Sequence, residues 1–156
     1  GLGAVSGNTD FTTEGILDTT TTLGGAEAGA FDQAITKTDP AMVMMSLATY
    51  QSIDPNNPAV FSSTIIDGHI RNALKYTGVV ISDSMSAEAL SSYDVSQLGV
   101  KLVEAGGDMS CIGQTDYVKP IVDGLNERAK SDPAFASKVT AAATRVMALK
   151  IKMGLA

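Results

Sequence analysis

The chain has 156 residues, of which 44% are hydrophobic and 18% charged, with a formal net charge of -6. This length suffices for one domain with a hydrophobic core. An acidic chain without Lys or Arg clusters is unsuited to binding nucleic acid, and no apolar run approaches the roughly 20 residues of a membrane span. The single Cys111 excludes an intrachain disulfide and a multi-cysteine metal site, and its apolar neighbours predict a buried, unreactive thiol.

The first 25 residues predict a long loop, because they are rich in Gly, Thr, Ser and Asn. Loops longer than about 12–15 residues in compact domains are usually functional or disordered. No secretory signal is visible, which leaves a secreted and a cytoplasmic location both open. The start at Gly1, without Met, leads us to expect that the native N-terminus was removed or lies upstream.

Strands and helices are predicted to alternate from residue 26 onward. A helix is expected at 26–35, and the apolar run after Pro40 predicts a buried strand at 41–47 whose Met side chains fill the core. Two Pro and two Asn predict a loop at 49–62. Ser62 or Ser63 then fits the cap of a helix with apolar residues at spacings of three and four, namely Ile65, Ile66, Ile70, Ala73 and Leu74.

The run at 79–82 predicts the clearest buried strand, and Asp83 follows it. A carboxylate at the end of a parallel strand either caps the next helix or carries chemistry, and the spacing alone does not decide between the two. The remaining chain predicts a helical stretch to residue 105, a break at Gly106 and Gly107, a strand at 109–112 and a helix at 118–129. Asp132 and Pro133 open a last helix, which Gly154 ends.

This alternation predicts a parallel α/β sheet with right-handed crossovers. About three strands are convincing, whereas a closed (β/α)8 barrel needs eight strands and about 250 residues. The chain is therefore either a small open sheet or part of something larger. The strand count alone permits an open-sheet binding module, but no Gly-rich phosphate loop follows any strand.

The segment from Gly78 to Leu90 resembles the nucleophile segment of glycoside hydrolase family 3, the β-glucosidase and β-N-acetylglucosaminidase family. Further matches follow in the family's order along nearly the whole chain. They are the start at 1–10, the strand and loop at 43–54, the Pro-Ala-x-x-Ser and Leu-Arg-like helix at 58–74, the Ala-Gly-x-Asp-like turn at 105–109 and the final helix at 145–155. The N-acetylglucosaminidase-like branch fits better than the larger multidomain β-glucosidases.

The resemblance implies a partial catalytic domain over residues 1–156, the C-terminal portion of a (β/α)8 barrel. Residues 1–25 would be its active-site loop and 26–156 its alternating strand and helix units. It implies retaining hydrolysis of a β-linked glucoside or N-acetylglucosaminide. Asp83 would be the nucleophile that forms a covalent glycosyl-enzyme intermediate, and Met85 would contact substrate. No metal or organic cofactor is implied.

Three departures from the family pattern bear on activity. Asn8-Thr9-Asp10 stands where the N-acetylglucosaminidase branch has Asp-Ser-His, so Asp10 would be a substitute acid/base or, alternatively, would cap the local loop. Leu47 stands where the family usually has a His, and Ser84 replaces a second Asp. The lone His69 is interpreted as structural because its spacing offers no partner, and Asp108 is expected to position the turn into its strand.

The resemblance also implies what the chain lacks. The Lys-His pair that binds substrate hydroxyls would precede Gly1, together with the first half of the barrel and its sugar-binding Asp and Arg. We therefore expect the isolated chain to be inactive unless it associates with the missing N-terminal half of the barrel. The alternative is a catalytically inactive family 3 scaffold that binds a sugar or a protein partner.

Overall fold

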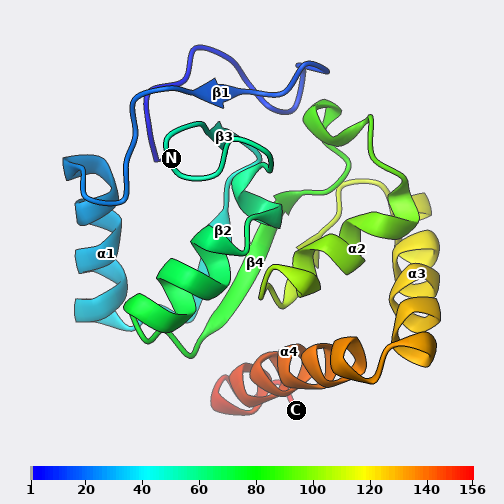
Figure 1. Cartoon of the computed structure of the whole chain (residues 1–156). Helices are drawn as coiled ribbons and strands as arrows, with labels where there is room; N and C mark the ends of the chain where they lie inside the picture. Colours follow the sequence, from blue (N-terminus) through cyan, green and yellow to red (C-terminus); the bar gives the residue numbers. More distant parts are fainter. Residues whose placement is uncertain (1) are drawn as a thin grey trace.

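The computed structural model describes residues 2–156 and contains two small parallel sheets surrounded by helices (Figure 1). The strands are β1 (Leu17–Asp18), β2 (Met42–Met45), β3 (Thr49–Tyr50), β4 (Val79–Ser84) and β5 (Met109–Cys111). The α-helices are α1 (Ala26–Thr38), α2 (Val95–Glu104), α3 (Val118–Ser131) and α4 (Pro133–Lys152). Short 3₁₀ turns η1 (Ala59–Phe61), η3 (Glu88–Leu90) and η4 (Thr115–Tyr117) and the π-helix η2 (Thr64–Ala73) complete the chain.

The main sheet has the order β2-β4-β5, and all of its pairs are parallel. The predicted alternation of strands and helices is confirmed, and so are the three strands. The parallel pair β1–β3 was not predicted, because two-residue strands leave no periodic pattern. It pairs the long N-terminal loop with the segment after β2 through Leu17 opposite Thr49 and Asp18 opposite Tyr50.

One face of the main sheet is buried under helices, and the other is open at β2. Met45 pairs with Ser82, and these side chains are 5% and 0% exposed. Met42 and Met44 point the opposite way and are 40% and 59% exposed. The prediction that these two methionines fill the core is therefore wrong, because the described chain supplies nothing to cover their side of the strand. Cys111 is partly exposed rather than buried, which corrects a second prediction.

The helices begin and end largely where the sequence predicts, with one informative exception. Asp132 caps α4 by accepting hydrogen bonds from the amides of Ala134 and Phe135 at 3.0 and 3.1 Å, as predicted. After β4, however, the chain runs through η3 before α2 starts, and Asp94 is the residue that caps α2. Asp83 lies within β4 and caps no helix, which removes the structural alternative for this carboxylate.

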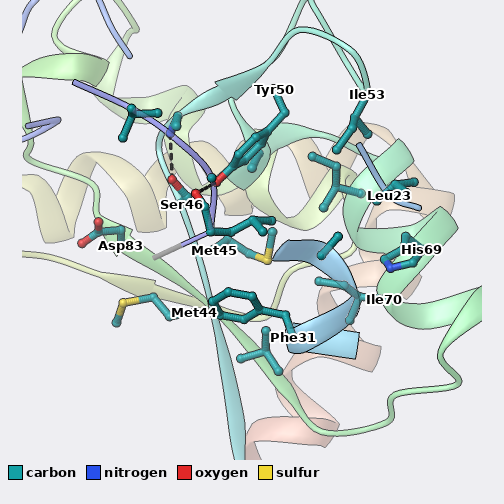
Figure 2. Close-up of a pocket in the computed structure, with 18 of the residues that line it drawn as sticks. Leu23, Phe31, Met44, Met45, Ser46, Tyr50, Ile53, His69, Ile70 and Asp83 are labelled. Carbon is teal, nitrogen blue, oxygen red and sulfur yellow. Dashed lines mark hydrogen bonds between the residues drawn. The ribbon is translucent and has the colours of Figure 1, made fainter. Parts of the chain in front are cut away.

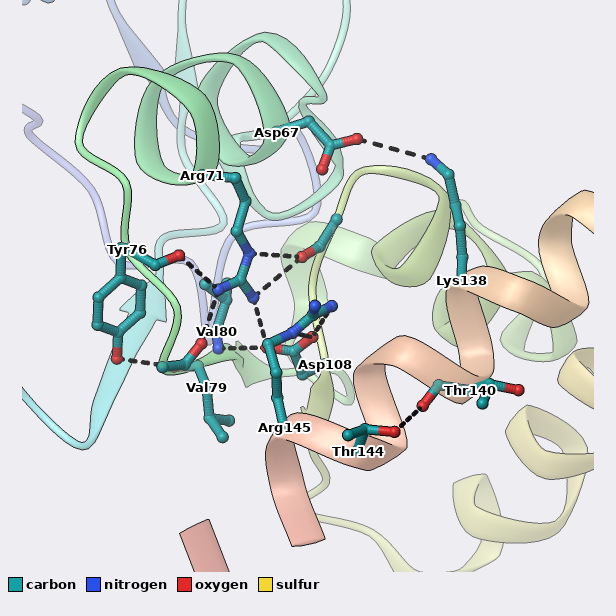
Figure 3. A network of polar contacts seen from close by, with 12 residues as sticks. Asp67, Arg71, Tyr76, Val79, Val80, Asp108, Lys138, Thr140, Thr144 and Arg145 are labelled. Atoms are coloured by element: carbon teal, nitrogen blue, oxygen red, sulfur yellow. Dashed lines mark hydrogen bonds and ion pairs between the residues drawn. The ribbon is translucent and has the colours of Figure 1, made fainter. Parts of the chain in front are cut away.

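A network of two arginines around Asp108 fixes the position of β4 (Figure 3). The Asp108 carboxylate is completely buried and pairs with Arg71 at 2.5 Å and Arg145 at 2.8 Å. It also accepts a hydrogen bond from the backbone N–H of Val80 at 2.8 Å. Arg71 donates further to the carbonyls of Tyr76, Gly78 and Gly106. Helices η2 and α4 are thereby joined to the start of β4, a larger role for Asp108 than the predicted local turn.

No helix among residues 2–156 is long and apolar enough to cross a membrane.

Candidate active site

The carboxyl ends of β2 and β4 meet the N-terminal loop around a cavity of about 710 Å³ (Figure 2). Asp83 lies at one end of the cavity, and His69 lies at the other. The walls between them are mostly apolar and include Phe31, Met44 and Ile70, while Asn8, Thr9 and Ser46 are polar members of the lining. In α/β folds, ligands bind at the carboxyl ends of parallel strands, where these residues meet.

Asp83 points to the open side of the sheet. Ile81 of β4 pairs with the exposed Met44 of β2, so these two side chains share a face. Asp83 follows Ile81 by two residues, and strand alternation puts its side chain on that face as well. The register between β4 and β5 shifts between Ile81 and Ser84, an irregularity beside the carboxylate. Such irregularities often re-aim side chains next to active sites.

The Asp83 carboxylate remains largely unengaged. Its Oδ1 accepts a hydrogen bond from the N–H of Ser84 at 2.7 Å, and none of the ion pairs among residues 2–156 involves it. A carboxylate that is held by its own backbone and faces a cavity retains lone pairs for an incoming electrophile. This arrangement suits a nucleophile.

Asp10 occupies a turn at the edge of the cavity but does not itself line it. The Asn8 side chain forms the turn by accepting a hydrogen bond from the Asp10 N–H at 2.8 Å, while the Asp10 side chain is exposed. The turn is docked onto η3, since the amide of Ala89 donates to the Thr9 carbonyl at 3.0 Å. Asn8 and Thr9 therefore face the cavity, and the Asp10 carboxyl lies outside its lining.

The other residues singled out by the sequence lie at different depths. Met85, expected to contact substrate, is 0% exposed and packs in the core, so its side chain offers no surface to a ligand. Leu47 is also buried in the core, at 2% exposure. Ser84 and Ser86 lie with their hydroxyl oxygens 3.1 Å apart, and Ser86 accepts a hydrogen bond from the amide of Gly113.

His69 has a partner that the sequence did not reveal. Its Nε2 lies 2.8 Å from a carboxylate oxygen of Asp32 on α1, 37 residues away in the chain. The pair joins η2 to α1 at the far end of the cavity. The prediction that His69 has no partner is therefore wrong, and its structural role stays a prediction.

Sequence reasoning overlooked Asp18, a completely buried carboxylate that stabilises the N-terminal loop. Burial alone would raise the pKa of Asp18, but hydrogen bonds from Thr21, Thr20 and Ala4 outweigh burial and hold that pKa well below its usual range. The signal was present in the run of threonines that follows Asp18, since Asp side chains often accept from amides two or three residues ahead.

Among residues 2–156, no group of three His, Cys, Asp or Glu side chains gathers in a way that could hold a metal ion.

The fold and the site together define the class: a parallel α/β domain with a carboxylate at the carboxyl end of a strand, facing a cavity. The model of the glycosyl hydrolase family 3 N-terminal domain matches residues 1–149, and the chain belongs to this family. The expected fold class, part of a (β/α)8 barrel, is confirmed by the solved structures that it resembles.

Two such structures are glycosidases. The chain is 36% identical to a β-N-acetylhexosaminidase from Beutenbergia cavernae, with a TM-score of 0.86 over 94% of this chain and 43% of that one. It is 26% identical to a family 3 β-N-acetylglucosaminidase from Paenibacillus, with a TM-score of 0.79 over 89% of this chain and 27% of that one. An uncharacterized secreted glycosyl hydrolase from Arthroderma benhamiae is 36% identical over 69 residues, which are 44% of this chain and 20% of that protein. The chain thus spans less than half the length of these relatives.

Proposed function

We propose that the chain carries the nucleophile of a retaining β-glycosidase, of the β-N-acetylhexosaminidase or β-glucosidase type. The observation that carries this proposal is the position of Asp83, which lies at the end of β4, faces the cavity and has no ion-pair partner among residues 2–156. Its support among relatives is the family match and the similarity to a β-N-acetylhexosaminidase.

In the proposed reaction, a carboxylate oxygen of Asp83 attacks the anomeric carbon while the bond from that carbon to the aglycone oxygen breaks. A proton donor protonates the departing oxygen. Water then attacks the glycosyl-Asp83 ester from the opposite face and loses a proton to the same group, which regenerates the carboxylate and releases the sugar with retained configuration.

Asp10 is our proposed proton donor, because it is the carboxyl group of the turn that borders the cavity. Its side chain lies outside the cavity lining, so direct proton transfer requires the Asp10 side chain to turn inward on the anchored turn. Retaining glycosidases place their two groups about 5–5.5 Å apart. With Asp10→Asn, an aryl glycoside with a poor leaving group should turn over more slowly and with an altered pH profile. An unchanged profile would exclude Asp10.

We further propose that hydrolysis requires strands beyond those described here. Among residues 2–156, one edge of β2 and one edge of β5 have no partner strand. Beside β2, the cavity separates the strand from α1, and the apolar Phe31, Met42 and Met44 flank that gap. An unpaired, apolar edge of this kind is a site for further strand pairing. The expected partner is the N-terminal half of a family 3 barrel, which would bring the remaining strands of a closed ring.

Labelling with a mechanism-based inhibitor tests the nucleophile. Two samples are incubated with a 5-fluoro-N-acetylglucosaminyl fluoride or a 2-deoxy-2-fluoroglucosyl fluoride: the chain alone, and a mixture of the chain co-expressed with the N-terminal barrel half of the Beutenbergia cavernae enzyme. In the mixture, the intact mass of the chain should rise by one glycosyl unit, and peptide mapping should place the label on Asp83. Labelling elsewhere would refute the assignment, while hydrolysis of an aryl glycoside by the isolated chain would refute the need for further strands.

An inactive scaffold is the second candidate, favoured by the buried Leu47 and by the placement of Asp10 outside the cavity. It predicts that the two halves associate but that the mixture hydrolyses no aryl glycoside with a poor leaving group, whether or not the glycosyl fluoride labels Asp83.

A further inference from the structure

The Asp18 carboxylate is completely buried, and both of its oxygens are occupied by donors of the N-terminal loop. Oδ1 accepts from the amides of Thr20 and Thr21 at 2.8 and 2.7 Å. Oδ2 accepts from the Thr21 hydroxyl at 2.8 Å and from the amide of Ala4 at 2.7 Å. None of the cations among residues 2–156 pairs with Asp18, so neutral donors alone hold this charge.

These bonds bring together two points of the chain that are 14 residues apart. A second connection lies beside them, since the Tyr50 hydroxyl donates to the Leu2 carbonyl at 2.9 Å. Gly3, which lies between Leu2 and Ala4, has φ +96°, and a Cβ at this position would overlap the Asp18 carboxylate. The backbone at residue 3 can therefore lie this close to Asp18 only because residue 3 is a glycine. Residues 4–17 form a loop that is closed at its base by Asp18.

The tip of this loop lies at the candidate active site. The carbonyls of Thr9 and Asp10 accept hydrogen bonds from the amides of Ala89 and Glu88, at 3.0 and 3.4 Å. Asn8 and Thr9 line the same cavity as Asp83. The loop is therefore held at its base by Asp18 and at its tip by η3, and the base uses charge-assisted hydrogen bonds, the stronger kind.

We propose that Asp18 is a positioning residue: it closes the 4–17 loop and thereby holds the Asn8–Asp10 turn at the cavity that Asp83 lines. The closure of the loop stands on geometry alone. Its consequence for catalysis rests on the proposed function, in which this turn supplies the proton to the leaving group.

The variant Asp18→Asn tests the closure with almost no change in side-chain volume. An Asn side chain has one acceptor oxygen, which can keep the amides of Thr20 and Thr21. Its NH₂ group would then face the Ala4 N–H, a donor against a donor, whereas the Thr21 hydroxyl can turn to accept. Hydrogen exchange at the Ala4 amide should therefore accelerate on the order of 10- to 100-fold, while Thr20 and Thr21 change less.

Two further variants keep this result interpretable. Asp54→Asn is the matched control, because Asp54 also accepts from loop amide groups, at Asn56 and Asn57, but lies outside the 4–17 loop. It should leave the Ala4 exchange rate unchanged. Gly3→Ala attacks the same closure from the other side and should accelerate Ala4 exchange even if Asp18→Asn fails to fold. Unchanged Ala4 exchange in a folded Asp18→Asn chain would overturn the proposal.

The catalytic consequence is measured with Asp18→Asn in the chain co-expressed with the N-terminal barrel half. By releasing the turn, Asp18→Asn should slow hydrolysis of an aryl glycoside with a poor leaving group more than hydrolysis of a dinitrophenyl glycoside, which needs little proton assistance. Equal slowing of both substrates would make Asp18 merely structural and overturn the positioning role. If the wild-type mixture neither labels nor turns over, the proposed function fails, while the exchange experiment still decides the closure of the loop.

Discussion

Replacing Asp108 by Ala should destabilise the protein more than any exposed ion-pair change. The Asp108 side chain is completely buried, while those of its partners Arg71 and Arg145 are 12% and 29% exposed. Removing the carboxylate leaves two guanidinium groups facing each other and deprives the Val80 amide of its acceptor. Breaking a buried pair by removing one partner typically costs about 3–5 kcal/mol.

That cost is a large part of the total stability of a domain, which is about 5–15 kcal/mol. With an unfolding entropy of about 2.1 cal/mol/K per residue, a chain of this length should lose about 10–15 °C in Tm. Thermal and urea unfolding followed by circular dichroism would measure it. Asp123→Ala is the control, since Asp123 pairs with Lys119 on an exposed helix surface and should leave Tm unchanged.

The geometry also orders the partners of Asp108. Arg145→Met should cost less than Asp108→Ala, about 1–2 kcal/mol, because Arg145 is partly solvated and Arg71 would still neutralise the carboxylate. A loss of less than about 1 kcal/mol in the free energy of unfolding of Asp108→Ala would contradict the role of Asp108 as a buried ion-pair centre. A larger loss for Arg145→Met than for Asp108→Ala would contradict it as well.

Three more predictions concern single positions. The pKa of Asp18 is lower in the folded than in the unfolded protein, so its ionised carboxylate stabilises the fold. This contribution is complete above pH about 4 and is lost as the pH falls through the lowered pKa. The free energies of unfolding of wild type and Asp18→Asn should therefore converge in strong acid. Gly124→Ala should destabilise the protein by about 2–3 kcal/mol in a urea titration, because the new Cβ would overlap the backbone oxygen of Ser96. Gly29→Ala should instead stabilise it by about 0.5–1 kcal/mol, because Gly29 lies in a helix and has open space for a Cβ. Asp132→Ala removes the cap of α4 and should cost about 1 kcal/mol, and an unchanged urea midpoint would contradict the observed cap.

Local patterns predicted much of the fold and of the candidate site. The apolar run ending at Asp83 indicated both a strand and a carboxylate at its end, since four apolar residues between Gly78 and a polar cluster suit a buried strand. Asp132-Pro133 and Gly154 marked the ends of α4, because caps are made by neighbours in the chain.

The sequence by itself determined the order of strands and helices, the parallel sheet and the carboxylate at the end of β4, because these depend on residues close together in the chain. Only the tertiary structure decided that Asp83 faces a cavity and that Asp10 lies outside it. It also gave His69 its partner Asp32 and exposed Met42 and Met44, on an open sheet face that no local pattern predicts. Contacts between residues far apart in the chain depend on packing, which periodicity does not encode. Asp18 makes both kinds of contact: its hydrogen bond from Thr21 is local and fits the threonine run in the sequence, whereas its hydrogen bond from Ala4 forms only in the folded loop.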